Sequence, residues 1–210
     1  RPLAKDKIQY CFHYLLSKYT KSVLYIMGNI TKKYNYADTN YAKEPAIYIA
    51  NHTSFLDILL LTSLHPKMIL VTAKWVWNSP VMGKVVKMAE YYPVEEGAVE
   101  GIDRLKAKVD KGYSIMIFPE GTRSKTDTIL KFKKGAFFLA EQLNVPIQPV
   151  IIHGAQYNMP KNDFLLKDGT LDVYVLPKIN QMSGEWGTTL NERRKSISKW
   201  LRNEYQLIKV

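Results

Sequence analysis

Cysteine is almost absent from this chain of 210 residues, and so are long apolar runs. Cys11 is the single cysteine, which excludes an internal disulfide and argues against a cysteine-rich metal site. No stretch reaches the ~18 consecutive apolar residues of a membrane-spanning helix, and no secretory signal peptide is visible. A Gly-x-Ser-x-Gly sequence is also missing, which disfavours a serine hydrolase.

Acidic residues are scarce relative to basic ones. The chain has 19 Asp and Glu against 30 Lys and Arg, so its formal net charge is +11. Such a charge favours a polyanionic partner: nucleic acid, an anionic membrane surface, or phosphorylated substrates and carriers. Because the lysines are scattered and no nucleic-acid-binding motif is present, we expect no nucleic acid partner.

The N-terminal segment is rich in aromatic residues with lysines between them. Apolar positions recur at close to helical spacing, which predicts a helix over about residues 5–36. Such a helix can lie in a membrane interface, with its apolar face in lipid and its ammonium groups on anionic lipid phosphates. It can equally pack on a sheet, and the two arrangements are not exclusive. We therefore treat residues 1–40 as an N-terminal helical, membrane-associating segment.

Residues 41–210 are predicted to form one α/β domain, with a mostly parallel central sheet flanked by helices. Apolar runs bounded by turn residues alternate with longer helical patterns, which favours parallel pairing with crossover helices. The predicted strands are 46–50, 68–72, 113–118, 147–152 and 171–176. The predicted helices are 55–64, 80–89, 98–111, 135–143 and 189–207, and the stretch 153–169 is typical of a surface loop.

The first polar block, Asn51–Asp57, follows the strand predicted at 46–50. On a regular helix His52 and Asp57 would lie about 140° apart. They can meet only if His52 precedes the helix and Asp57 lies just inside it, with Ser54 as the N-cap residue. A carboxylate on one imidazole nitrogen leaves the other free to take a proton. The alternative is structural, because Ser54 and Asp57 also fit a capping box, and Asn51 would then brace the turn.

The second polar block, Phe118–Ser124, follows the strand predicted at 113–118. Gly121 lets backbone N–H groups approach an anion, and Arg123 can hold a phosphate through two parallel hydrogen bonds. Glu120 and Thr122 complete the turn. As a bare pattern this is also compatible with a structural turn carrying solvated charges. Because parallel strands open at one edge of a sheet, the two blocks are expected to face each other.

No metal site is predicted. His52, Asp57 and Glu120 could act as ligands, but no close ligand pair such as His-x-x-x-His is present. The remaining histidines, at 13, 65 and 153, have no carboxylate at comparable spacing and are interpreted as structural.

Taken together, the two blocks resemble the motifs of the glycerolipid acyltransferase family, the 1-acyl-sn-glycerol-3-phosphate acyltransferases. The stretch Lys131–Phe137 resembles the basic segment after the third motif of that family, and Val145–Val150, with Pro146, resembles its fourth. The resemblance covers roughly residues 45–155 and also extends to bacterial acyltransferase domains fused to membrane exporters. A chain that begins at Arg1 without Met is expected to be part of such a longer protein or a processed product.

The resemblance implies transfer of a fatty acyl group from acyl-CoA or acyl-carrier protein to a lysophospholipid hydroxyl, without a cofactor or a metal. His52 would be the general base, oriented by Asp57, and Arg123 would hold the acceptor's phosphate with help from Glu120 and Gly121. Lys74 would be a further anion contact. The implied location is the cytoplasmic face of a membrane, either peripheral or as a domain of a membrane protein.

One departure from the family pattern concerns the acceptor. The second family motif usually carries an arginine. The corresponding segment of this chain, Tyr91–Gly97, has no arginine and contains two glutamates. Arg104 lies too close to the second block and inside a predicted helix. A different lysolipid or hydroxylated acceptor therefore stays an alternative to 1-acyl-glycerol-3-phosphate. From another class, the alternative is a non-catalytic module that binds anionic membranes.

Overall fold

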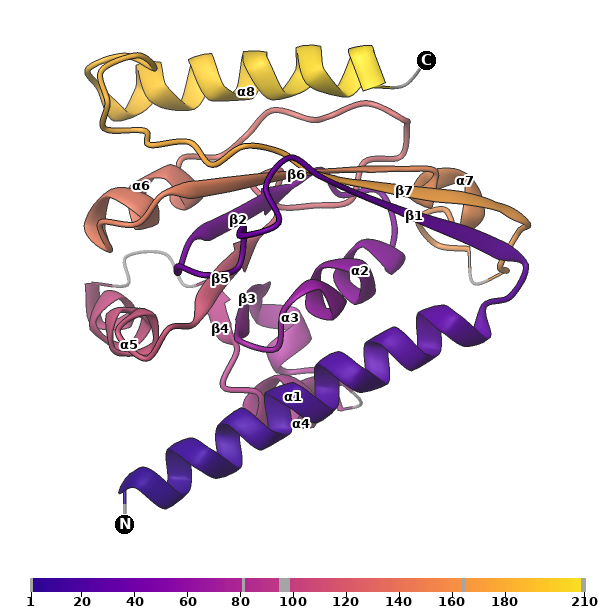
Figure 1. Ribbon diagram of the computed structural model, residues 1–210, viewed down its shortest axis with the longest axis horizontal. Coiled ribbons are helices and arrows are strands. Elements are labelled where there is room, and N and C mark those ends of the chain that lie inside the picture. The colour runs from indigo at the N-terminus through magenta and orange to yellow at the C-terminus, as the bar shows by residue number, and fades with distance from the viewer. Residues whose placement is uncertain (1, 81, 95–98, 164, 209–210) are drawn as a thin grey trace.

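A computed structural model describes residues 2–80, 82–94, 99–163 and 165–208. Its centre is a seven-stranded sheet in the order β1-β7-β6-β2-β5-β3-β4 (Figure 1). The strands are β1 Ile30–Tyr36, β2 Ile47–Ala50, β3 Met68–Ala73, β4 Tyr92–Val94, β5 Ser114–Ile117, β6 Ile147–His153 and β7 Gly169–Val175. All neighbouring pairs are parallel except β6 with β7, so the predicted α/β class with a mostly parallel sheet is confirmed.

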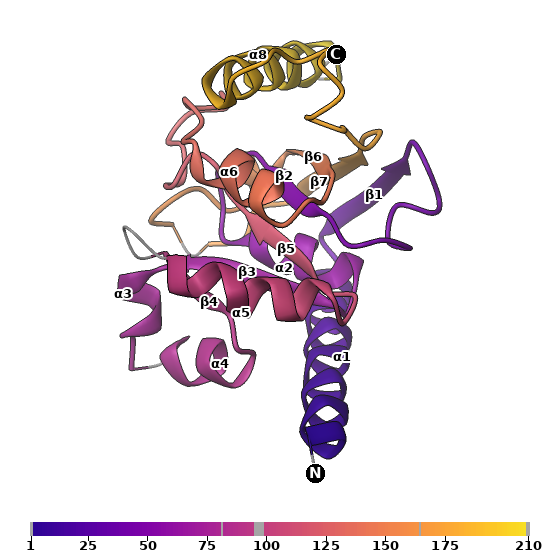
Figure 2. The ribbon, with the colours of Figure 1, turned by 90° about the vertical axis from the view of Figure 1, so that its left-hand side faces the viewer.

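Helices cover both sides of this sheet. They are α1 Pro2–Ile26, α2 Leu56–Leu64, α3 Lys74–Trp77, α4 Met82–Met88, α5 Val99–Val109, α6 Gly135–Gln142, α7 Ala155–Asn158 and α8 Leu190–Ile208. In both ribbon views α8 lies on one side of the sheet and α1 on the other (Figures 1 and 2). The central strands β2, β5 and β6 are buried along their whole length, which is why their sequences are mostly apolar rather than alternating.

The N-terminal segment differs from the prediction of one helix to residue 36. Helix α1 ends at Ile26, and the chain turns at Gly28 and Asn29 into β1. Strand β1 pairs with β7 from Ile30 to Tyr36, and this sheet pairing overrides the helical spacing. The N-terminal segment is thus joined to the same sheet as the rest of the chain. None of the described helices combines the length and the apolar character that crossing a membrane requires.

Short elements were also missed by the sequence prediction. Strand β4 and helix α3 lie between predicted elements, and α7 interrupts the stretch expected to be a loop. Strand β7 was expected to continue the parallel pattern but runs antiparallel to β6. Arg104 lies inside α5 as predicted. In the second-motif region, Glu95, Glu96 and Gly97 lie outside the described residues.

The carboxyl ends of β2, β3, β5 and β6 open at one edge of the sheet, because these strands are parallel and adjacent. Strand β6 ends there in a glycine turn. Gly154 has a left-handed backbone (φ 83°) and is the N-cap residue of α7. A Cβ atom at this position would stand 1.9 Å from the carbonyl oxygen of Thr170. The turn therefore requires glycine both for its conformation and for this close approach to β7.

The substitution Gly154→Ala is expected to lower the free energy of unfolding by ~3 kcal/mol or more, because strain and a backbone clash add. Gly184→Ala is a matched control. Gly184 has nearly the same φ (85°), but a Cβ atom placed there would have no atom within 4 Å. Gly184→Ala should lower the free energy of unfolding by only about 1 kcal/mol, the cost of backbone strain alone. Chemical denaturation measures both; equal losses would show that the contact with Thr170 does not matter.

Candidate active site

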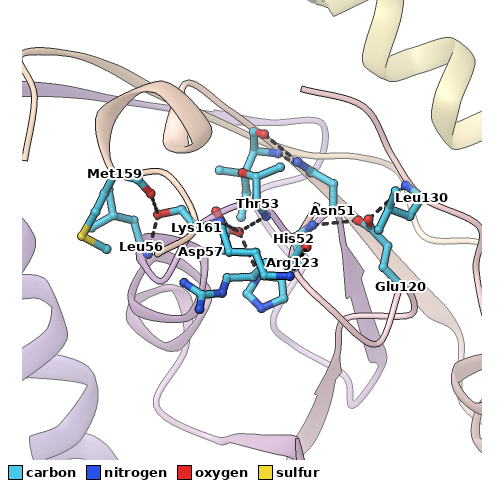
Figure 3. Close-up of polar contacts among 12 residues, drawn as sticks. Asn51, His52, Thr53, Leu56, Asp57, Glu120, Arg123, Leu130, Met159 and Lys161 are labelled. Carbon is cyan, nitrogen blue, oxygen red and sulfur yellow. Dashed lines mark hydrogen bonds and ion pairs between the residues drawn. The ribbon is translucent and has the colours of Figure 1, made fainter. Parts of the chain in front are cut away.

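The site lies at the shared carboxyl edge of the parallel strands. Residues 51–57 follow β2, residues 118–124 follow β5, Lys74 follows β3, and the segment from Gly154 to Lys161 follows β6. Figure 3 shows the polar contacts at which the segments after β2, β5 and β6 meet. The prediction that the two polar blocks face each other is confirmed by direct hydrogen bonds between them.

His52 and Asp57 are paired. Nδ1 of His52 lies 2.9 Å from Oδ2 of Asp57, whose side chain is fully buried. Since an ionised carboxylate only accepts, Nδ1 carries the proton in the neutral ring and Nε2 keeps its lone pair. The pair is therefore arranged so that Nε2 can accept a proton from a bound molecule.

The same carboxylate oxygen also shapes the turn. The backbone N–H groups of Thr53 and Ser54 donate to Oδ2 of Asp57 at 2.7 and 2.8 Å. Helix α2 begins at Leu56, one residue later than expected, and its N-cap position is Phe55 rather than Ser54. The hydroxyl of Ser54 still accepts the N–H of Leu56 at 3.2 Å. Asp57 thus makes the contacts of both alternatives, the capping of the turn and the orientation of His52.

The second block holds the backbone of His52 on both sides. The N–H of His52 donates to Oε1 of Glu120 at 2.8 Å, and its carbonyl oxygen accepts the N–H of Ser124 at 2.7 Å. The imidazole ring stacks on Phe118, with ring centroids 3.9 Å apart. Only 13% of the His52 side chain is exposed. Backbone and ring are therefore fixed independently.

Glu120 is a buried carboxyl group with two backbone partners. Besides the N–H of His52, it accepts the N–H of Leu130 on Oε2 at 2.9 Å. Burial raises the pKa of Glu120 to about 7, with the charge of Asp57 adding to the shift, although both backbone hydrogen bonds and Arg202 oppose it. Since both oxygens are engaged by the chain itself, these contacts make Glu120 a positioning group for His52 rather than a direct anion ligand.

The turn after Glu120 is open and cationic. Gly121 adopts φ 73°, and its Cα is covered by the side chain of Lys133, whose Nζ lies 2.6 Å from a Cβ placed there. Thr122 is exposed and Arg123 is half-buried. Within the described part of the chain, the guanidinium of Arg123 has no hydrogen bond or ion pair, and its donors are available to an anion.

The other predicted residues serve different positions. Asn51 bridges β2 to β6, because its side-chain amide donates to the carbonyl of Ile152 and accepts the N–H of Ile152, both at 2.8 Å. Lys74 is exposed at the start of α3, on the edge that carries the site. Lys131 is exposed in the loop before α6. Pro146 lies at the opposite end of β6, where its carbonyl accepts the N–H of Ile47.

Helix α8 braces the loop that carries Leu130. The guanidinium of Arg194 donates to the carbonyl of Phe132 at 2.9 Å, and that of Arg202 donates to the carbonyl of Leu130 at 3.0 Å. Leu130 in turn donates its N–H to Glu120. The sequence carries no indication of this support, because α8 is about seventy residues away along the chain.

A segment after α7 was also missed. The carbonyl of Met159 accepts the hydroxyl of Ser54 at 2.7 Å, and Nζ of Lys161 donates to Oγ1 of Thr122 at 3.1 Å and to the carbonyl of Arg123 at 3.0 Å. This segment therefore touches both polar blocks (Figure 3). It lies within the stretch interpreted as a surface loop, and a single lysine there carries no pattern that would have marked it.

No group of three or more His, Cys, Asp or Glu side chains that could hold a metal ion occurs in the described ranges. His13 is buried between α1 and the sheet, 5.2 Å from the ring of Tyr113, and burial lowers its pKa to about 4. Lys108 adds to this shift. This environment agrees with the structural role expected for His13.

Comparison with known proteins adds independent information. A family model described as "Acyltransferase" matches residues 29–153. A 1-acyl-sn-glycerol-3-phosphate acyltransferase of Cocos nucifera is 34% identical over 161 residues, which are 73% of this chain and 51% of that protein. An enzyme of the same name from Saccharomyces cerevisiae is 34% identical over 151 residues, which are 68% of this chain and 50% of that protein. The chain thus spans about half the length of these relatives.

A solved structure shares the fold. The crystal structure of the 1-acyl-sn-glycerophosphate acyltransferase PlsC from Thermotoga maritima superimposes with a TM-score of 0.79. The match covers 98% of this chain and 84% of that one at 21% identity. At this identity the likeness establishes the fold.

The buried Glu120 makes a prediction about pH. Its pKa is raised in the folded state from 4.5 to about 7, so the unfolded chain loses the proton first as pH rises. The stability that Glu120 contributes is full below pH 4.5 and is lost as pH rises to about 7. The difference amounts to about 3 kcal/mol in the free energy of unfolding.

Urea denaturation from pH 4 to 8 would test this, with Glu120→Gln as the comparison, because glutamine cannot ionise. The free energy of unfolding of the wild type should fall relative to that of the variant across this range. Parallel pH profiles would show that Glu120 has the same pKa in the folded and the unfolded protein, so that burial does not raise it.

Proposed function

Because the chain belongs to the acyltransferase family, we propose that it transfers a fatty acyl group to the hydroxyl of a lysophospholipid, most simply 1-acyl-glycerol-3-phosphate. The observation that carries the proposal is the hydrogen bond between His52 and Asp57 beside the open turn of Arg123. A base for a hydroxyl and a donor group for a phosphate thus lie at one edge of the sheet. The acyl donor would be acyl-CoA or acyl-carrier protein, and no cofactor is needed.

The reaction requires two proton transfers, one from the acceptor hydroxyl to His52 and one from His52 to the leaving thiolate. Nε2 of His52 takes the proton from the acceptor hydroxyl while Asp57 stabilises the resulting imidazolium. The hydroxyl oxygen attacks the thioester carbonyl, a C–O bond forms, and the negative charge moves to the carbonyl oxygen. When this intermediate collapses, the C–S bond breaks and the leaving thiolate takes the proton from His52. Backbone donors near the two turns would stabilise the oxyanion.

The rigid placement of His52 supports direct transfer without an acyl-enzyme. Its ring is held by Asp57 and Phe118, and its backbone by Glu120 and Ser124. When a base is fixed in this way, the entropic cost of orienting it toward the hydroxyl is met during folding and binding, and it no longer adds to the reaction barrier. Arg123 would hold the acceptor's phosphate, and Lys74 would be a further anion contact.

Attachment to an anionic membrane surface, on its cytoplasmic face, belongs to the same proposal. Helix α1 has an unusual distribution of side chains. Its buried positions include Gln9, His13, Ser17, Thr20 and Leu24. Its exposed positions include Ile8, Leu15, Tyr19 and Ile26. A face toward the core that includes four buried polar residues, and an apolar face with lysines toward the outside, support insertion into a lipid interface.

The substitution His52→Ala should reduce acyl transfer by ~100-fold or more, because the general base is removed while the fold is kept. Release of free thiol from a series of acyl-CoAs, with and without 1-acyl-glycerol-3-phosphate, measures this. Acceptor-dependent release by the wild type that is lost in the variant is the expected result. Activity of the variant within tenfold of wild type would contradict the role of His52.

Two other outcomes point elsewhere. Release by the wild type that does not depend on this acceptor would favour a different hydroxylated acceptor. No release with any acyl-CoA or acyl-carrier protein, together with unchanged vesicle binding by His52→Ala, would favour a non-catalytic membrane-binding module.

Arg123→Ala should raise the KM for 1-acyl-glycerol-3-phosphate by ~10-fold or more, because a charge-assisted hydrogen bond to phosphate is lost. The KM for the acyl donor should change little. Steady-state kinetics with each substrate varied in turn separates the two effects. An unchanged KM for the acceptor would exclude Arg123 from phosphate binding.

A further inference from the structure

We propose that Lys161 is a second phosphate-binding cation of the acceptor site, acting beside Arg123. This inference rests on the proposed function. It lies outside the residues matched by the family model, which end at 153. It commits to a phosphate monoester carried by the acceptor rather than to the phosphates of the acyl donor.

The ammonium group of Lys161 is attached to the turn that carries Arg123. It donates to Oγ1 of Thr122 at 3.1 Å and to the carbonyl oxygen of Arg123 at 3.0 Å. A lysine ammonium has three N–H donors. Within the described part of the chain these two contacts use two of them, which leaves one donor and the full positive charge for a ligand at the turn.

The backbone on either side of Lys161 is also held in place by hydrogen bonds. Two residues earlier, the carbonyl of Met159 accepts the hydroxyl of Ser54 at 2.7 Å. The N–H of Asp163 donates to the carbonyl of Pro160, which closes a turn around Lys161. Lys161 is half-buried, unlike a solvated surface lysine. A cation held in this way loses less conformational entropy when an anion binds.

Charge balance favours more than one cation at this turn. A phosphate monoester carries a charge of about −1.5 to −2 at neutral pH. The carboxylate of Asp57 lies at the same site and repels it, and the guanidinium of Arg123 supplies one positive charge. Lys161 brings a second positive charge to the carbonyl of Arg123 itself. Together the two cations match the charge of the phosphate.

The test compares Lys161→Met, Lys161→Gln and Lys161→Arg with the wild type, using acyl-CoA as the donor. Lys167→Met is the matched control, because Lys167 is an exposed lysine in the same connection between α7 and β7. Each variant is assayed with 1-acyl-glycerol-3-phosphate and with 1-acyl-glycerol, which lacks the phosphate. Both substrates are varied, and the unfolding temperature of each variant is recorded.

Lys161→Met should raise the KM for the phosphorylated acceptor by ~10- to 100-fold, with kcat and the KM for acyl-CoA close to wild type. Lys161→Arg should recover most of the affinity. Lys161→Gln should behave like the methionine variant, because its amide can keep a hydrogen bond to the turn but carries no charge. The reaction with 1-acyl-glycerol and the Lys167→Met control should be unaffected.

Wild-type affinity in Lys161→Gln would overturn the proposal, because Lys161 would then only tether the turn. An unchanged acceptor KM in Lys161→Met, or a rise confined to the KM for acyl-CoA, would overturn it too. These results are distinct from failure of the proposed function, in which the wild type itself shows no turnover that depends on 1-acyl-glycerol-3-phosphate.

Discussion

One carboxylate oxygen, Oδ2 of Asp57, organises the site. It accepts from the ring of His52 and from the backbone N–H groups of Thr53 and Ser54. In a buried position each of these donors would be costly to leave unpaired. The turn, the start of α2 and the orientation of the His52 ring therefore depend on the same group. Structural and chemical roles cannot be separated at this residue, because a single oxygen performs both.

Around this centre, the site is stabilised by parts of the chain that are distant in sequence. The turn after β5 holds the backbone of His52 through Glu120 and Ser124. Arg202 of α8 holds the loop of Leu130, which contacts Glu120. The segment after β6 contacts both turns. The site is thus a property of the whole sheet edge, and α8 stabilises it through the loop of Leu130 and Glu120 rather than through direct contact with His52.

The sequence was informative where a local pattern and a strand end coincide. The pairing of His52 with Asp57 follows from a turn placed before a helix, and the buried strands are visible as apolar runs. Strand β1 could not be predicted, because its pairing with β7 competes with local helical spacing. Lys161 was not predicted for a related reason: its role is set by the contact with Thr122 and Arg123, which no local pattern encodes.

The pairing of β1 with β7 has a consequence for the order in which the molecule is completed. Strand β1 lies at the end of the sheet and pairs with β7, whose residues follow it by well over a hundred positions. During synthesis, β1 leaves the ribosome long before β7, so its place in the sheet is not fixed until β7 follows. Closing so long a loop is entropically costly and slows folding. Until then, β1 has no strand to pair with, whereas α1 can already pack on α2.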